Sequence, residues 1–180
     1  MLEKIIMAGF GGQGILFMGK LLAQLMMEQG KQITYFPSYG AEVRGGTANC
    51  HVIISDDDIH SPVADTATTL IIMNAPSYER FAPLLEDDGL MILNTSMVQK
   101  HQPVERGTII EIPATDEANA LGNVRIANML MLGAYLERRK ILPMDVLIDY
   151  LPSLLGARKA QLLEINVAAL RRGQELARSE

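Results

Sequence analysis

Residues 4–14, Lys-Ile-Ile-Met-Ala-Gly-Phe-Gly-Gly-Gln-Gly, join a short apolar run to a glycine-rich segment. A run of this kind, rich in Ile and ending in glycines, is typical of a buried strand in a parallel sheet. Residues 14–29 then take up the apolar spacing of a helix, and Gly30 supplies a C-terminal stop. Strand, glycine turn and helix in this order predict the first unit of an α/β fold.

The same alternation of short strands and helices continues to residue 112. Strands are predicted where apolar and β-branched runs recur, over residues 32–36, 47–55, 68–73, 90–94 and 107–112. Pro37 is expected to end the first of these strands, and a short helix is expected over residues 76–85. The acidic turn at residues 56–58 predicts a hairpin that returns through Ile59–Pro62, which gives the sheet an antiparallel edge.

After Pro113 the apolar spacing becomes helical, with helices predicted over residues 113–121, 124–140, 144–155 and 157–178. No repeat, low-complexity tract or linker divides the chain. We therefore predict a single α/β domain over residues 1–180, with a three-layer α/β/α Rossmann-like architecture. A mostly parallel, mixed sheet is expected in the core of residues 1–112, followed by a helical C-terminal tail over residues 113–180.

The composition excludes several classes of function. The 180 residues carry 16 Lys and Arg against 21 Asp and Glu, a net charge of −5, so no general basic surface is available for nucleic acid. Cys50 is the sole cysteine, which excludes an iron–sulfur cluster held by this chain alone, because a cluster needs about four thiolates. The sequence shows neither a signal peptide nor an apolar run near the ~18 residues of a membrane span, so a cytoplasmic protein without a membrane partner is expected.

The glycine segment satisfies the spacing G-x-G-x-x-G between a strand and a helix. Backbone N–H groups and the positive end of the helix can then hold an anion such as a pyrophosphate. A nicotinamide dinucleotide also requires Asp or Glu about 20 residues further on, where this chain has Tyr-Phe-Pro-Ser at residues 35–38, so that cofactor is disfavoured. A structural role, in which the glycines let strand and helix approach closely, stays open. The candidate binding residues of this segment are Gly9, Gly11, Gly12, Gln13 and Gly14.

A second concentration of glycine lies in the loop at residues 37–46, at the carboxyl end of the second predicted strand. Ligands of open α/β sheets bind beside such ends. Arg44, followed by Gly45 and Gly46, offers a guanidinium and bare backbone N–H groups to a phosphate or carboxylate. Glu42 can instead pair with Arg44 and make the loop structural, and the residues alone do not decide between the two interpretations.

No catalytic residue and no metal site is predicted in this chain. His51, His60 and His101 lack the spacing of metal ligands, and Ser38 has no His and Asp partners at a recognisable spacing. Cys50 lies in a strand that is expected to be buried, where it acts as an inert, small apolar residue. The chain alone is therefore expected to catalyse no reaction.

Three segments stand out together: GFGGQG at residues 9–14, PSYGAEVRGGTANC at 37–50 and VRIANM at 124–129. In this order and spacing they resemble the gamma subunits of the 2-oxoacid:ferredoxin oxidoreductases, thiamine-dependent enzymes that oxidise 2-oxoacids to acyl-CoA. Within the family, residues 44–50 are most similar to subunits assigned to 2-oxoglutarate, followed by those for branched-chain 2-oxoacids and pyruvate. The resemblance adds Tyr39 to the candidate residues, beside Glu42, Arg44, Gly45 and Gly46.

The resemblance implies a division of labour among subunits. Thiamine diphosphate and Mg²⁺ are expected on the alpha and beta chains, and iron–sulfur clusters on beta or on a ferredoxin-like delta chain, with ferredoxin as the electron acceptor. The gamma chain is expected to pack against alpha near the entrance for coenzyme A (CoA), so the glycine turn and the Arg44 loop face either CoA or the neighbouring chain. A free-standing nucleotide- or CoA-binding protein and a nicotinamide dehydrogenase domain are the alternatives.

Overall fold

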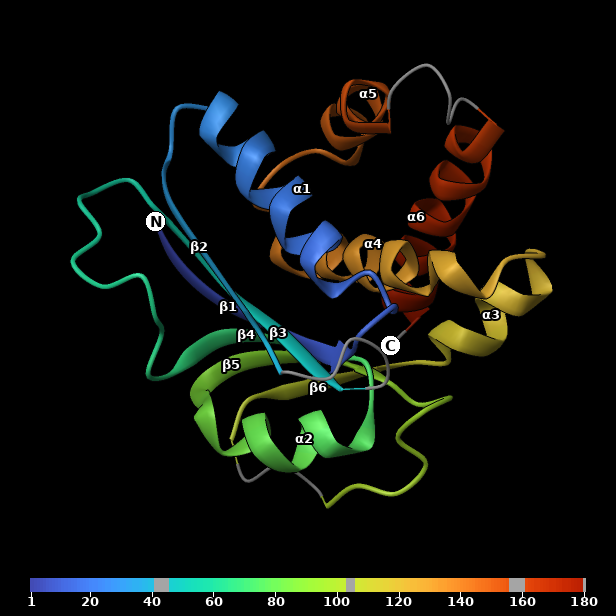
Figure 1. The fold of residues 1–180 in the computed structure, drawn as a ribbon, viewed down its shortest axis with the longest axis horizontal. Helices are drawn as coiled ribbons and strands as arrows, with labels where there is room; N and C mark the ends of the chain where they lie inside the picture. The colour runs from blue at the N-terminus through green and yellow to red at the C-terminus, as the bar shows by residue number, and fades with distance from the viewer. Residues whose placement is uncertain (41–45, 103–105, 156–160, 180) are drawn as a thin grey trace.

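A computed structural model of the chain describes residues 1–40, 46–102, 106–155 and 161–179. These residues contain one six-stranded mixed sheet in the order β2-β3-β1-β4-β5-β6 (Figure 1). The strands β1, β4, β5 and β6 are parallel to one another, whereas β3 pairs antiparallel with both β1 and β2. The bounds of the strands are β1 Leu2–Phe10, β2 Gln32–Tyr39, β3 Thr47–Ser55, β4 Ala67–Ile72, β5 Leu85–Asn94 and β6 Thr108–Ile112.

Helices cover both faces of the sheet, which confirms the three-layer α/β/α arrangement. The short helix α2 lies on one face, and α1, α4, α5 and α6 lie on the other (Figure 1). Two 3₁₀ turns, η1 (Ala82–Leu84) and η2 (Val124–Ile126), follow α2 and precede α4. The α-helices are α1 Ile15–Glu28, α2 Ala75–Phe81, α3 Ala114–Ala120, α4 Ala127–Arg139, α5 Met144–Leu155 and α6 Gln161–Ser179.

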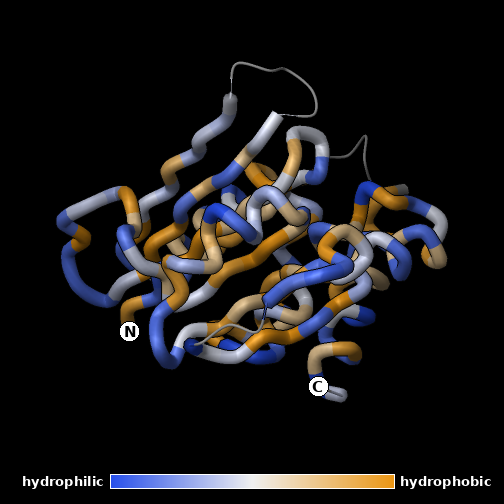
Figure 2. The backbone as a smooth tube through the Cα atoms, turned by 90° about the horizontal axis from the view of Figure 1, so that it is seen from below, coloured by the Kyte–Doolittle hydropathy of each residue, from blue (hydrophilic) through white to orange (hydrophobic). Residues whose placement is uncertain are grey.

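The central strand β1 is buried on both faces, which explains its unbroken apolar sequence. Ile5 and Met7 contribute to the larger apolar cluster beneath α1 and α4, while Ile6 and Ala8 contribute to the smaller one beneath α2. Hydrophobic segments accordingly run through the middle of the molecule, with hydrophilic segments at its periphery (Figure 2). None of the described helices is long and apolar enough to span a membrane.

The prediction that Pro37 ends the second strand is wrong, because β2 continues through it to Tyr39. The N–H of Gly40 donates to the carbonyl of Thr47 on β3 (3.2 Å). Because the direction of the backbone N–H and C=O groups alternates along a strand, those of Ser38, Phe36 and Thr34 also point toward β3. The backbone nitrogen of Pro37 therefore points the other way, toward the open edge of the sheet. There its missing N–H removes no hydrogen bond, which is why an edge strand tolerates it.

The hairpin expected through Ile59–Pro62 is also absent. These residues are irregular, although the antiparallel edge itself is confirmed and is made by β2 and β3. The reason is that β3 is paired along its whole length, from Thr47 to Ser55, with β1 on one side and β2 on the other. A returning strand would have found no free edge of β3, so the chain passes on to β4 instead.

Smaller differences concern the ends of helices. The helix predicted over residues 124–140 begins as the 3₁₀ turn η2, and the one predicted over residues 76–85 ends at Phe81 and gives way to η1. The strand predicted over residues 90–94 already begins at Leu85. For the last helix, predicted from residue 157, residues 156–160 lie outside the described residues, and α6 is described from Gln161.

Helices α4 and α6 cross at two glycines that face one another. A Cβ atom added at Gly133 of α4 would overlap the carbonyl of Leu170, and one added at Gly173 of α6 would overlap the carbonyl of Leu130. The two backbones are therefore in direct contact, which leaves no room for any side chain at either position. This contact fixes the position of α6 against α4, and with it the position of the helical tail.

We predict that Gly133→Ala destabilises the chain by about 1–3 kcal/mol, because the new methyl group pushes two backbones apart. Helix propensity alone gives the opposite sign, since Ala is favoured over Gly by ~1 kcal/mol in a helix. Urea unfolding distinguishes the two effects, with Gly40→Ala as the control, because a Cβ at Gly40 meets no atom within 4 Å. An unchanged or raised unfolding midpoint in Gly133→Ala would contradict a direct backbone contact.

Candidate functional site

The glycine turn lies where two neighbouring parallel strands send their helices to opposite faces of the sheet. After β1 the chain enters α1 on one face, and after the adjacent β4 it enters α2 on the other (Figure 1). Such a switch point opens a crevice at the carboxyl ends of the two strands, the usual binding place of open α/β sheets. The turn predicted from the sequence to hold a ligand is therefore at the expected position in the fold.

The side chain of Gln13 occupies part of this crevice. Its Oε1 accepts a hydrogen bond from the N–H of Phe10 (2.6 Å), and its Nε2 donates to the carbonyl of Met73 at the end of β4 (3.4 Å). The N–H of Gln13 in turn donates to the carbonyl of Phe10 (3.2 Å). Gln13 thus holds the turn closed and links the ends of β1 and β4, which is a structural role.

The glycines of the turn have different roles. A Cβ at Gly9 would lie 2.5 Å from Gln13 Oε1 and 2.8 Å from Met73 Cβ, so Gly9 allows a close approach to β4. Gly14 has φ 76°, and a Cβ there would overlap the side-chain amide of Asn128, whose Nδ2 donates to the Gly14 carbonyl (3.3 Å). At these two positions the close contacts favour the structural interpretation of the motif.

The start of α1 remains open for an anion. No side chain caps the helix at Gly14, and no acidic residue lies in its first turn. The first N–H groups of a helix have no partner within the helix, and they carry the positive end of its dipole. Gly12, with φ 97° and open space around it, is exposed just before them. Gly12 and the first turn of α1 therefore have the geometry that the predicted anion cradle requires, and the binding of an anion there stays a prediction.

The turn is linked to the second predicted motif through Gly46, whose carbonyl accepts a hydrogen bond from the N–H of Gly11 (2.9 Å). Tyr39, at the end of β2, is 73% exposed. The other three predicted residues of this loop, Glu42, Arg44 and Gly45, lie outside the described residues. The described residues therefore place both ends of this loop at the glycine turn, and its centre lies outside them.

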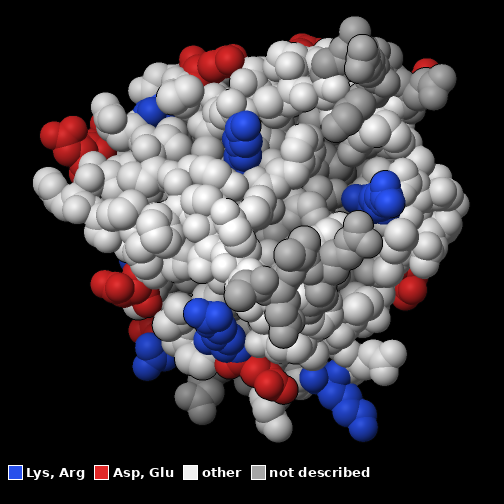
Figure 3. Space-filling view, in the orientation of Figure 1, with Lys and Arg blue, Asp and Glu red and all other residues white. Residues whose placement is uncertain are grey.

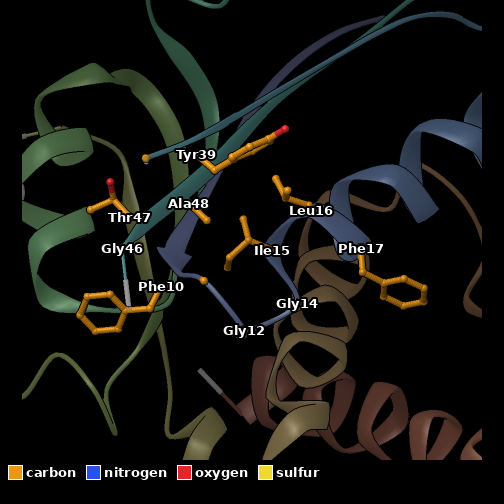
Figure 4. A pocket seen from close by; sticks show the side chains of 12 residues that line it. Phe10, Gly12, Gly14, Ile15, Leu16, Phe17, Tyr39, Gly46, Thr47 and Ala48 are labelled. Carbon is orange, nitrogen blue, oxygen red and sulfur yellow. The ribbon is translucent and has the colours of Figure 1, made fainter. Parts of the chain in front are cut away.

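A cavity of about 600 Å³ lies between the glycine turn, the start of α1 and the ends of β2 and β3 (Figure 4). Its volume is in the usual range of small-molecule sites. The side chains of Ile15, Leu16 and Tyr39 surround it, and Gly40 and Gly46, which flank the loop at 41–45, both line it. Among the described residues that line it, none is charged. Its described walls therefore suit an uncharged, partly apolar group beside the open helix end.

The described residues of the surrounding face are also poor in charge. In the view that shows α1 in front, the described Lys and Arg side chains stand apart from one another, and acidic side chains are confined to the periphery (Figure 3). A face of this kind, with the exposed side chain of Tyr39 on it, is typical of a surface that contacts another molecule.

The remaining titratable candidates do not come together. His51 is buried, its Nδ1 accepts a hydrogen bond from the N–H of Ala64 (3.2 Å), and burial lowers its pKa. His101 lies elsewhere, 3.0 Å from a carboxylate oxygen of Glu111. Cys50 is buried under α1, and burial raises its pKa to about 12, so the thiol is inert as predicted. In the described ranges no group of three or more His, Cys, Asp or Glu residues is placed to hold a metal ion.

The comparison with protein families decides the identity. The profile of the pyruvate ferredoxin/flavodoxin oxidoreductases matches residues 4–176. The chain belongs to this family. The resemblance drawn from the three sequence segments is thereby confirmed at the level of the family, and the family is one of oxidoreductases.

Individual relatives in the family carry different names. Ketoisovalerate oxidoreductase subunit VorA of Methanothermobacter thermautotrophicus is 38% identical over 130 residues, which are 72% of this chain and 27% of VorA. 2-Oxoglutarate synthase subunit KorC of Archaeoglobus fulgidus is 29% identical over 97% of this chain and 88% of KorC. The match thus spans about a quarter of one relative and most of the other.

The fold is shared with a solved structure, the 2-oxoglutarate:ferredoxin oxidoreductase of Magnetococcus marinus with 2-oxoglutarate, coenzyme A and succinyl-CoA bound. The similarity has a TM-score of 0.91 at 24% identity, and it covers 99% of this chain and 31% of that one. At this identity it shows a common fold. In that oxidoreductase and in VorA the fold of this chain is one part of a chain about three times as long.

We predict that Gln13→Ala destabilises the folded chain by about 1–2 kcal/mol, because it leaves the N–H of Phe10 without its partner in a half-buried turn. Gln29→Ala, at an exposed position where α1 ends, is the matched control and is expected to change the unfolding free energy by less than about 0.5 kcal/mol. Equal unfolding midpoints of the two variants in urea would show that Gln13 does not hold the turn.

Proposed function

We propose that this chain is the gamma subunit of a thiamine-dependent 2-oxoacid:ferredoxin oxidoreductase. The complex converts a 2-oxoacid, CoA and oxidised ferredoxin to acyl-CoA, CO₂ and reduced ferredoxin. The observation that carries the proposal is the family match over residues 4–176, which leaves almost no part of the chain outside it. KorC supports a separate subunit of this size, because this chain corresponds to 88% of its length.

The proposed substrate is 2-oxoglutarate. KorC and the Magnetococcus marinus oxidoreductase support this choice, because both carry 2-oxoglutarate in their names and both match nearly the whole chain. Branched-chain 2-oxoacids and pyruvate are the alternatives. VorA has the higher identity over a shorter segment, and pyruvate synthase subunit PorC of Thermotoga maritima is 30% identical over 93% of this chain.

The proposed role of the chain is to support assembly and to shape the entrance for CoA. Thiamine diphosphate, Mg²⁺ and the iron–sulfur clusters are assigned to alpha, beta and delta chains, since the single, buried Cys50 cannot supply the thiolates of a cluster. The described walls of the cavity at the glycine turn carry no charge and suit the pantetheine arm of CoA, and the open start of α1 suits a phosphate. The Magnetococcus marinus protein, which shares the fold, was solved with coenzyme A bound.

We predict that the chain alone neither oxidises 2-oxoacids nor binds thiamine diphosphate, and that it is required together with alpha and beta chains for activity. Anaerobic, CoA-dependent reduction of viologen is the assay, with 2-oxoglutarate, 2-oxoisovalerate and pyruvate compared as substrates. Turnover by the chain alone contradicts the proposal, as does full activity of alpha and beta without it. CoA binding by a chain that never co-purifies with alpha and beta supports the alternative of a free-standing CoA-binding protein.

We predict that Arg44→Ala in the assembled enzyme raises the KM for CoA by roughly ten- to a hundredfold. Arg44 precedes the cavity-lining Gly46 by two residues, and one charge-assisted hydrogen bond to a phosphate contributes about 1.5–3 kcal/mol. Arg44→Lys is expected to recover part of the loss, because an ammonium keeps the charge but not the planar fork. The KM for the 2-oxoacid is the internal control and changes little.

The structural alternative, an ion pair of Arg44 with Glu42, gives a different result. Glu42→Ala then reproduces the defect of Arg44→Ala, and both variants lower the melting temperature. An unchanged KM for CoA in Arg44→Ala excludes a role of this guanidinium in binding CoA.

A further inference from the structure

The connection between β3 and β4, residues 56–66, is irregular and extends away from the sheet, at the left of Figure 1. Both of its ends are fixed to neighbouring elements. The N–H of Asp56 donates to the carbonyl of Met1 (3.1 Å), and the hydroxyl of Thr66 donates to a carboxylate oxygen of Glu86 (2.6 Å). The position of the stretch between these ends depends on other contacts.

This stretch, residues 58–65, is tied to the sheet by one hydrogen bond among the described residues. The N–H of Ala64 donates to Nδ1 of His51 on β3 (3.2 Å). The other hydrogen bonds described here join Ser61 to Val63 and stay within the stretch. Ala64 is 4% exposed, so its N–H is shielded from water and depends on the imidazole as acceptor.

The ring of His51 is enclosed by apolar neighbours. His51 is 8% exposed, and its partners in register, Ile6 on β1 and Phe36 on β2, share its face of the sheet. Two charged groups act on the ring, Arg80 of α2 and Asp65 at the end of the stretch. Burial and the positive charge of Arg80 lower the pKa of the ring, while Asp65 acts in the opposite direction. At neutral pH the ring is therefore uncharged, and Nδ1 is available as an acceptor.

Protonation reverses the role of Nδ1. In the neutral ring Nδ1 accepts and Nε2 carries the proton, whereas in the imidazolium both nitrogens carry one. A protonated Nδ1 then faces the N–H of Ala64 as donor against donor, and the hydrogen bond of 3.2 Å is lost. A buried N–H without an acceptor is unfavourable, so the stretch gains by moving into water, where both groups find partners.

We propose that His51 is a pH-sensitive latch, which holds residues 58–65 on the sheet at neutral pH and releases them when Nδ1 takes up a proton. One proton passes from the solvent to Nδ1, and one hydrogen bond, from the N–H of Ala64, breaks. Phe36 is 44% exposed beside the ring, so release widens the exposed surface at the open edge of the sheet. The latch is a property of this fold and is independent of the proposed function.

The sign of the pH dependence follows from proton linkage. The latched ring binds a proton less readily than the released ring, whose pKa returns toward the ordinary value of about 6.5. The latch is therefore complete above about pH 6.5 and is lost as the pH falls below it. In that range the ratio of released to latched molecules rises about tenfold per pH unit, until the lowered pKa of the latched ring is reached.

Amide hydrogen exchange of the ¹⁵N-labelled full chain, followed by NMR spectroscopy on both sides of about pH 6.5, measures the latch. The protection factor of Ala64 is expected to fall about tenfold per pH unit below that pH, while that of Met91 on the buried strand β5 stays nearly constant. His51→Asn is the matched variant. Its Oδ1 is bonded to Cγ as Nδ1 is and accepts at every pH, so the protection of Ala64 is expected to become independent of pH.

His60→Gln is the control, because it removes an exposed histidine of the same stretch and is expected to keep the full pH response of Ala64. The latch is excluded if the protection of Ala64 does not change with pH, or if His51→Asn keeps the same pH dependence. It is also excluded if His60→Gln abolishes the response, or if Met91 loses protection equally, which marks unfolding of the whole domain.

A second measurement needs no variant and decides the case if His51→Asn does not fold. In the unaltered chain the ring signals of His51 and the amide signal of Ala64 are expected to follow one titration curve, with a midpoint below about 6.5. Two different midpoints, or a ring that titrates while the amide signal of Ala64 stays unchanged, contradict the latch.

Discussion

The architecture depends on the close packing around the turn that follows the central strand β1. β1 is buried on both faces, so its continuation must turn between the end of β4 and the start of α4. Gly9 permits the contact with Met73, and Gly14 permits the contact with Asn128. Because both neighbours are close, the turn cannot widen, and the hydrogen bonds of Gln13 keep it in one conformation. The start of α1 is thereby held at a constant place beside the cavity.

Most of the fold could be predicted from local patterns. Apolar runs such as residues 4–8 mark buried strands, and helical spacing marks the tail, because burial on one or two faces leaves a period in the sequence. Pairing of strands leaves no such period. The prediction of a hairpin through Ile59–Pro62 was wrong because β1 and β2 already pair with the two edges of β3. The turn at residues 56–58 gives no information about these partners.

The candidate site was predictable only in part, for the same reason. The spacing of glycines marked the turn, but the separate roles of Gly9 and Gly14 depend on Met73 and Asn128, which lie far along the chain. The hydrogen bond between Asn128 and Gly14 joins residues 114 positions apart.

Pro37, on the open edge of the sheet, affects the tendency of the chain to aggregate before it binds a partner. An exposed strand presents a row of backbone groups that another copy can extend into a growing β-structure, which is a common route to aggregation. Pro37 lies in the outward set of β2 and interrupts that row with a missing donor and a bulky ring. A second strand can therefore not pair continuously along β2. The edge discourages fibril growth by its backbone, while the side chains of Phe36 and Tyr39 next to it remain exposed for contacts of another kind.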